Sequence, residues 1–435
     1  MNSGTHSQPL RPVNQAELEV IFAKHERFMQ AIIGGARASF NFCNLSGLNF
    51  SNRDLANADF TGAVLAHANL MHCRLDNAVF FSADLRYANL EGASLVKADL
   101  RGAILRATNL VGANLQDADL RDGKINEMTR KGELIGGWGG GNARPMGADM
   151  SDANLMGAKL SGAVAAHTNF SHANMRGCIL TRANLKGANL TGVDLYEADL
   201  AGADLRQANL RGAILVGANM AMTEIAGADF TQVLTDTPAG RSILELDIPV
   251  SELLQQHCLW VQSSGAEGKK VDLSGFDLRP AFPLIAPVFT AIKAHNITLY
   301  GLKMPGIEMQ FAQFDGGDLR GCDFTRGDLR GISLRGAALS MSNLSGTRLG
   351  PLELTPEKFK MTDLSGASLR HVNFKGADLA RADLSGADCS YANFTGADLH
   401  GVNFLNAYMT GSILTDARLD GADMGYLADD SEMIK

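Results

Sequence analysis

A chain of 435 residues would ordinarily suggest roughly two to four globular domains. Hydrophobic residues make up 46% of the chain and aromatic residues 6%, which excludes disorder and favours a narrow core of leucine and alanine. No apolar run approaches the roughly 20 residues that span a bilayer and no signal-peptide core is visible, so we expect a cytoplasmic protein without a membrane span.

The first predicted element is an amphipathic helix over residues 14–33. Asn14, followed three residues later by Glu17, resembles the capping box that starts many helices. An apolar stripe at helical spacing follows, formed by Leu18, Ile21, Phe22, His25, Phe28 and Met29. A glycine pair then separates the helix from a different periodicity.

From Phe40 onwards, every fifth residue is leucine or phenylalanine, and the residue two places earlier is usually alanine. A period of five fits neither the 3.6 residues per turn of an α-helix nor the alternation of a strand. It predicts a repeat architecture in which each unit buries its apolar residue, here called the centre, only by stacking on its neighbours. Such centres run from Phe40 to Ile125, from Met150 to Phe230 and from Leu299 to Met424.

Stretches such as residues 83–87 (ADLRY) and 188–192 (ANLTG) resemble the pentapeptide repeat family, whose pattern is A-(D/N)-L-x-x. The resemblance, to the tandem two-module bacterial type, implies an all-β solenoid. Each module would be a right-handed quadrilateral β-helix with four pentapeptides per coil. The centre and the small residue two places before it would point inward, and the other three positions outward.

A loop insertion is predicted over residues 126–145, because the centres Ile125 and Met150 lie too far apart for consecutive units. Its glycine-rich run, residues 136–141, indicates a flexible excursion and lacks the pattern of a phosphate-binding loop. Trp138 is compatible with two placements, as an exposed contact or packed back against the solenoid. The candidate partner contacts of this loop are Trp138, Arg130, Lys131 and Arg144.

A second amphipathic helix is predicted over residues 249–262, with its apolar residues spaced as in the first helix. We expect both helices to cover the open end of a coil, which would otherwise expose leucines and unpaired backbone. His25 and His257 occupy equivalent positions in the two helices. They are either a proton-active or ligand-binding pair or, the alternative we favour, histidines hydrogen-bonded to backbone of the first coil.

The segment 278–298 is apolar and proline-rich, and the sequence fits a degenerate coil with a short helix around residues 286–295 without fixing its conformation. The spacing between the modules is not a multiple of five, so coaxial and bent arrangements both agree with the sequence. The predicted organisation is an N-terminal segment with its helix (1–39), a first module (40–233), a linker with the second helix and degenerate coil (234–298), a second module (299–424) and a tail (425–435).

Acidic residues concentrate at the C-terminal end. Residues 376–435 hold ten acidic side chains against three basic ones, which accounts for nearly all of the net charge of −8. An acidic solenoid end is suited to a basic partner or to imitation of a DNA phosphate path. The candidate partner contacts here are Asp416, Asp420 and Asp423.

Cysteines replace alanine inside the repeat rather than forming a reactive or metal-binding set. Four of them stand two places before a centre and Cys389 is itself a centre, which predicts buried, reduced thiols. His67 with His72, and His167 with His172, lie on successive faces, too far apart to share a metal. With no nucleophile, zinc or nucleotide motif in the chain, we expect no enzyme activity and no catalytic, cofactor-binding or metal site.

We therefore predict a non-catalytic scaffold that presents flat faces, the loop and the acidic end to a protein partner of unknown identity. Its oligomeric state is not predicted, and no direct nucleic-acid binding is expected. The resemblance offers one alternative: some family members resemble B-form DNA, bind type II topoisomerases such as gyrase and protect against quinolones. Those proteins are generally acidic along their whole length, whereas the first module here carries many arginines and lysines.

Overall fold

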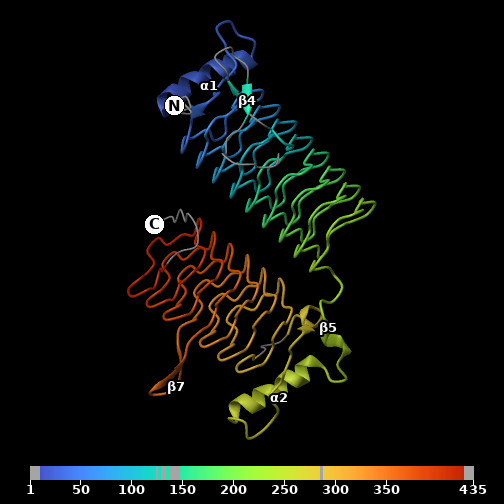
Figure 1. Cartoon of the computed structure of the whole chain (residues 1–435), viewed down its shortest axis with the longest axis vertical. Coiled ribbons are helices and arrows are strands. Elements are labelled where there is room, and N and C mark those ends of the chain that lie inside the picture. Colours follow the sequence, from blue (N-terminus) through green and yellow to red (C-terminus); the bar gives the residue numbers. More distant parts are fainter. Residues whose placement is uncertain (1–9, 124–125, 129–133, 137–146, 285–287, 426–435) are drawn as a thin grey trace, which may run out of the picture. The chain divides into compact units, whose positions relative to one another are not determined.

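The computed structural model describes residues 10–123, 126–128, 134–136, 147–284 and 288–425. The chain divides into two compact units, Met1–Thr237 and Pro238–Lys435, each built mainly from stacked coils (Figure 1). Each unit has its own buried apolar core.

A regular coil contains twenty residues, because most parallel bridges join positions twenty apart, as in Ser39 with Asp59 and Asp59 with Val79. The backbone N–H of a centre donates to a carbonyl one coil further on, for example from Phe40 to the oxygen of Asp59 at 2.7 Å. Four pentapeptides therefore make one coil. The bridged stretches are mostly single residues separated by turns, so few continuous strands form.

The Asp or Asn that precedes most centres closes the following turn. The Asp59 carboxylate accepts the N–H of Thr61 at 3.1 Å, and the amide oxygen of Asn89 accepts that of Glu91 at 3.1 Å. The second turn residue then takes a positive φ, as at Gly62 (62°). The position before the centre therefore prefers Asp and Asn, because their side-chain oxygens can accept this backbone N–H in the turn.

The interior is filled by the centres and the small residues that alternate with them. Phe60 is fully buried, with ring centroids 4.9 Å from Phe40 and 4.6 Å from Phe80 in stacked geometry. The thiol of Cys73 donates to the carbonyl of Phe50 at 2.9 Å, and burial raises its pKa to about 11. Cys73, Cys178, Cys322 and Cys389 are buried, which confirms the prediction that cysteine here acts as a small apolar residue.

In the first unit, α1 (Gln15–Met29) packs its buried residues Leu18, Phe22 and His25 against the first coil. Asn14 and Glu17 form the predicted capping box. The side chain of Gln15 both donates to the carbonyl and accepts from the N–H of Asn49, at 2.9 and 3.0 Å. Gln15 therefore satisfies backbone groups at the edge of the coil.

The sequence did not reveal a short strand that precedes each helix. In the first unit β1 (Arg11–Pro12) pairs in parallel with β2 (Cys43–Asn44). In the second unit β5 (Arg241–Ser242) pairs in the same way with β6 (Phe276–Asp277), and η1 (Ile243–Glu245) and α2 (Val250–Gln262) lie between them. Both units thus begin with the same order of strand, helix and strand.

The insertion in the first unit is longer than the spacing of centres predicts. Bridges such as Ile104 with Asp149 join positions forty-five apart, so twenty-five residues rather than twenty are added to the coil. Part of the insertion is a hairpin in which β3 (Asn126–Met128) pairs antiparallel with β4 (Leu134–Gly136). Ile125 lies outside the described residues.

The uninterrupted run of centres predicted from Leu299 to Met424 is wrong. Bridges such as Ser333 with Asp363 span thirty residues, and the ten extra residues form a hairpin of β7 (Leu352–Thr355) and β8 (Lys358–Lys360). Leu354 and Phe359, which the periodicity makes centres, are 43% and 44% exposed. The insertion stays in phase because ten is a multiple of five.

Residues 288–298 belong to a coil rather than to the short helix considered for residues 286–295. Phe289 and Ala294 are fully buried centres, and their neighbours Val288 and Lys293 bridge to the next coil. The preceding η2 (Arg279–Ala281) is a single 3₁₀ turn. Bridges from Asp272 and Asp277 to residues 293 and 298 span twenty-one residues, which accounts for the irregular spacing in this segment.

Deleting residues 351–360 should leave the second unit folded. The deletion joins Gly350 to Met361 and places Leu364 five positions after Leu349, which restores a coil of twenty residues. We expect the free energy of unfolding to change by no more than about 1 kcal/mol, since a surface loop contributes little beyond its closure entropy. Thermal and urea unfolding followed by circular dichroism would measure it.

The matched control deletes residues 351–359 and leaves one residue too many in the coil. That variant should be less stable, because the extra residue must either bulge out of the coil or displace the next inward side chain. Equal stability of the two deletions would contradict the claim that an insertion must be a multiple of five residues to leave the coils undisturbed.

Candidate interaction surfaces

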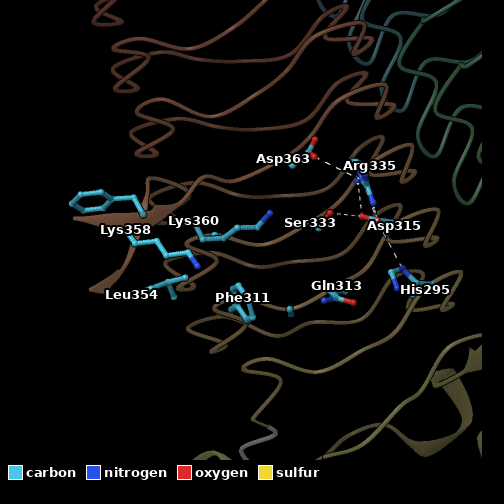
Figure 2. Close-up of a pocket in the computed structure, with 13 residues that line it drawn as sticks. His295, Phe311, Gln313, Asp315, Ser333, Arg335, Leu354, Lys358, Lys360 and Asp363 are labelled. Carbon is cyan, nitrogen blue, oxygen red and sulfur yellow. Dashed lines mark hydrogen bonds and ion pairs between the residues drawn. The ribbon is translucent and has the colours of Figure 1, made fainter. Parts of the chain in front are cut away.

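An open groove of about 530 Å³ lies in the second unit between the β7–β8 hairpin and the outer wall of the coils (Figure 2). The coils contribute His295, Phe311, Ala312, Gln313, Asp315, Gly331, Ser333, Arg335 and Asp363, and the hairpin contributes Leu354, Lys358, Phe359 and Lys360. The hairpin thus converts one side of a filled solenoid into a concave surface.

Three charged or titratable side chains form a column on the coil wall, one coil apart: His295, Asp315 and Arg335. The guanidinium of Arg335 donates to Asp315 from Nη2 at 2.7 Å and from Nε at 3.2 Å, and Ser333 donates its hydroxyl at 2.5 Å. Burial alone would raise the pKa of Asp315, but these hydrogen bonds outweigh it and hold the pKa below its usual range. The wall is therefore a fixed, ionised network.

The hairpin wall carries cations that are not neutralised in this way. Lys358 and Lys360 extend from β8 toward the coil wall (Figure 2), and neither forms an ion pair with any described residue. Lys358 pairs in register with Thr355 and Lys360 with Leu352, whereas the acidic Glu353 pairs with Phe359. Because paired residues share a face of a hairpin, the two lysines and Glu353 lie on opposite faces.

Gly331 lets the base of the hairpin approach the coil. It has a φ of 66°, and an added Cβ would lie 2.9 Å from the Cβ of Leu352 and 3.1 Å from the carbonyl oxygen of Lys360. A larger residue would therefore push the hairpin away. The groove is built by this close contact.

The candidate contacts predicted in the first insertion, Trp138, Arg130, Lys131 and Arg144, lie outside the described residues. Asp416, Asp420 and Asp423 are exposed in the last coil of the second unit. Asp420 accepts from Arg418 at 2.9 Å, and this hydrogen bond lowers its pKa, while Asp423 accepts the N–H of Gly425 at 3.0 Å. Two of the three carboxylates thus already have partners within the chain.

Arginines neutralise many carboxylates along both units, a pattern that the sequence analysis missed. In the order Asp-centre-Arg, the arginine folds back onto the aspartate two places earlier. The Nη2–Oδ2 distance is 2.6–2.8 Å in Asp84–Arg86, Asp99–Arg101, Asp119–Arg121, Asp204–Arg206, Asp277–Arg279, Asp318–Arg320 and Asp328–Arg330. The tripeptide D-L-R is the signal that would have revealed these pairs.

The two histidines do the same structural work in their units, as the favoured alternative predicts. Nδ1 of His25 accepts the N–H of Ala38 at 3.0 Å, and Nδ1 of His257 accepts that of Val271 at 3.2 Å. Each N–H belongs to the residue two places before the first centre. Burial lowers the pKa of both histidines, so the neutral ring is the accepting form.

In the described part of the chain, no group of three or more His, Cys, Asp or Glu side chains is arranged to hold a metal ion. His67 instead stacks on Tyr87 with ring centroids 4.9 Å apart. No described helix has the length and apolar character needed to cross a membrane.

The family model for pentapeptide repeats matches the chain in eight copies, over residues 38–80, 83–122, 158–195, 194–232, 306–350, 362–401 and 387–425. These ranges cover more than half of the chain, which therefore belongs to the pentapeptide repeat family. The matches leave out residues 351–361, which hold the β7–β8 hairpin.

Solved structures similar to this chain include a fluoroquinolone resistance protein and two pentapeptide repeat proteins. A trypsin-treated form of QnrB1, a plasmid-mediated fluoroquinolone resistance protein, is 20% identical with a TM-score of 0.36, over 46% of this chain and 92% of that one. HetL of the cyanobacterium Nostoc sp. strain PCC 7120, involved in heterocyst differentiation regulation, is 22% identical with a TM-score of 0.16, over 94% and 96%. Rfr23 of the cyanobacterium Cyanothece 51142 is 28% identical with a TM-score of 0.20, over 31% and 91%. No curated protein matches the chain.

Mild acid should loosen the helix at the start of each unit. Unfolded histidine titrates near pH 6.5, and the folded pKa values of His25 and His257 are lower. The unfolded state therefore binds more protons below pH 6.5, and the stabilisation is present above that pH and lost as the pH falls. Hydrogen exchange should show weaker protection of the Ala38 and Val271 amides at pH 5.5 than at pH 7.5.

The variant His25→Gln provides the control, because a glutamine carbonyl can accept the same N–H without titrating. In this variant the pH dependence should disappear at Ala38 and persist at Val271. Unchanged pH dependence at Ala38 would show that His25 is not the group responsible.

Proposed function

We propose that this chain is a non-catalytic scaffold that binds a partner protein in the groove between the β7–β8 hairpin and the coil wall. One observation carries the proposal: lysines without ion-pair partners among the described residues face an open groove in a chain whose repeat interior is filled by its own side chains. Concave surfaces with a few placed polar groups are where proteins usually bind ligands. The acidic last coil is a second, weaker surface, since two of its three candidate carboxylates have internal partners.

The proposal includes a finer description of the fold. We take each unit as a right-handed quadrilateral β-helix, as in the pentapeptide repeat family, with α1 and α2 as caps of its first coil. The coils of four pentapeptides support this description, as do the backbone groups that Gln15, His25 and His257 satisfy. Buried free thiols favour a cytoplasmic location.

DNA mimicry with binding to a type II topoisomerase is the alternative function. A mimic needs a continuous path of unpaired negative charge to replace DNA phosphates. Here the repeated Asp-centre-Arg pairs neutralise carboxylates in both units. We therefore rank the scaffold function above DNA mimicry.

Affinity capture with the intact chain and with the 351–360 deletion would test the scaffold function. The intact chain should retain a specific partner, and the deletion should lose it, because it removes one wall of the groove and leaves the coils continuous. Mass spectrometry would identify the partner. A deletion of residues 122–146, which places Gly147 after Arg121 and restores the repeat in the first unit, is the matched control.

Retention of the partner by the 351–360 deletion would rule out the hairpin groove as the binding site. Loss of the partner only on deleting residues 122–146 would transfer the function to the first insertion, where Trp138 lies.

A gyrase supercoiling assay would test the alternative function. We expect neither inhibition of supercoiling nor protection from a quinolone at micromolar protein, because the Asp-centre-Arg pairs interrupt the negative charge along both units. Inhibition that grows with the concentration of this chain would support DNA mimicry over the scaffold function.

A further inference from the structure

We propose that the groove binds an extended, acidic segment of the partner protein, with carboxylates on Lys358 and Lys360 and an apolar side chain between the two walls. This inference rests on the proposed function and adds the chemistry of the partner. It starts from the charge of the groove. The chain has a net charge of −8, yet two ammonium groups without an ion-pair partner among the described residues project from one strand into the same hollow.

The spacing of the two lysines matches an extended peptide. Lys358 and Lys360 are two residues apart on β8 and share a face, which places their attachment points about 7 Å apart. An extended segment presents every second side chain on one face at the same repeat. Two carboxylates separated by one residue can therefore reach both ammonium groups at once.

The coil wall fixes the side on which the acidic residues lie. Asp315 is ionised and held by Arg335 and Ser333, and Asp363 lies 3.8 Å from the Nε of Arg335. Because Arg335 is already engaged by these two carboxylates, the coil wall offers the ligand no free cation, and the acidic face turns toward the lysines of the hairpin. Phe311 and Leu354 supply apolar contact lower in the groove (Figure 2).

A peptide fits this site better than a nucleic acid. A single strand of nucleic acid carries a charge at every nucleotide and binds through a groove that is positive along its length, often with exposed aromatic platforms. Here Asp315 and Asp363 line the same groove as the lysines. A volume of about 530 Å³ accommodates a few side chains of a short segment, within the range of ordinary ligand sites.

Fluorescence anisotropy with the full chain would test this inference. The probe is the fluorescein-labelled peptide GSDLDLDSG, compared with GSNLNLNSG, GSKLKLKSG and a single-stranded DNA 12-mer. The acidic peptide should bind most tightly and weaken as salt rises. The double variant K358E/K360E should weaken its binding about tenfold or more, since two charge pairs become two repulsions.

The control variant K186E/K375E makes the same change in net charge at exposed lysines outside the groove. It should bind the acidic peptide within about twofold of the natural chain. Thermal unfolding of both variants checks that they are folded.

Three results would overturn the inference: equal binding of the acidic peptide by the two double variants, tighter binding of the basic or neutral peptide, or tighter lysine-dependent binding of the DNA. Each of these results can be distinguished from a failure of the proposed function. If partner capture depends on residues 351–360 while the acidic peptide fails to bind, the groove remains the interface and only the chemistry assigned to the partner is wrong.

Discussion

The backbone hydrogen bond between residues one coil apart is the interaction on which the rest of the structure depends. It forms at nearly every centre, at about 2.7 Å in examples such as Leu45 to the carbonyl of Val64. This bond fixes the height of each coil, and therefore how much space each side chain has inside and outside. A large centre fits only beside a small residue. The side chain of the Asp or Asn before the centre accepts a backbone N–H two residues later and so stabilises the turn. The five-residue pattern in the sequence results from that geometry.

The same bond creates a problem at the first coil, which has no coil before it. Both units solve it with a strand, a helix and a histidine in the same order. Histidine suits this position because its neutral ring can be buried against the coil and still accept a backbone N–H. The cost is sensitivity to protonation, since a buried imidazole loses its acceptor when it becomes charged.

Much of the fold was predictable because its rule is local. The period of five predicts the centres, the buried cysteines and the parallel stacking, and the apolar stripes predict both helices. Features that depend on non-local contacts were missed. The β7–β8 hairpin was hidden because ten inserted residues keep the period, although Leu352 and Glu357 stand where other units have a small residue. The groove could not be foreseen without the hairpin, and the candidate site therefore had no clear signal in the sequence.

The in-phase length of the insertions has a consequence for how such a protein diversifies. Ten and twenty-five extra residues are both whole numbers of units, so every coil downstream keeps its partners and its outward faces. A pentapeptide that loses its small inward residue can leave the stack as a projecting hairpin without disturbing the remainder. New recognition surfaces can thus arise from existing repeats, at almost any coil, with the scaffold unchanged.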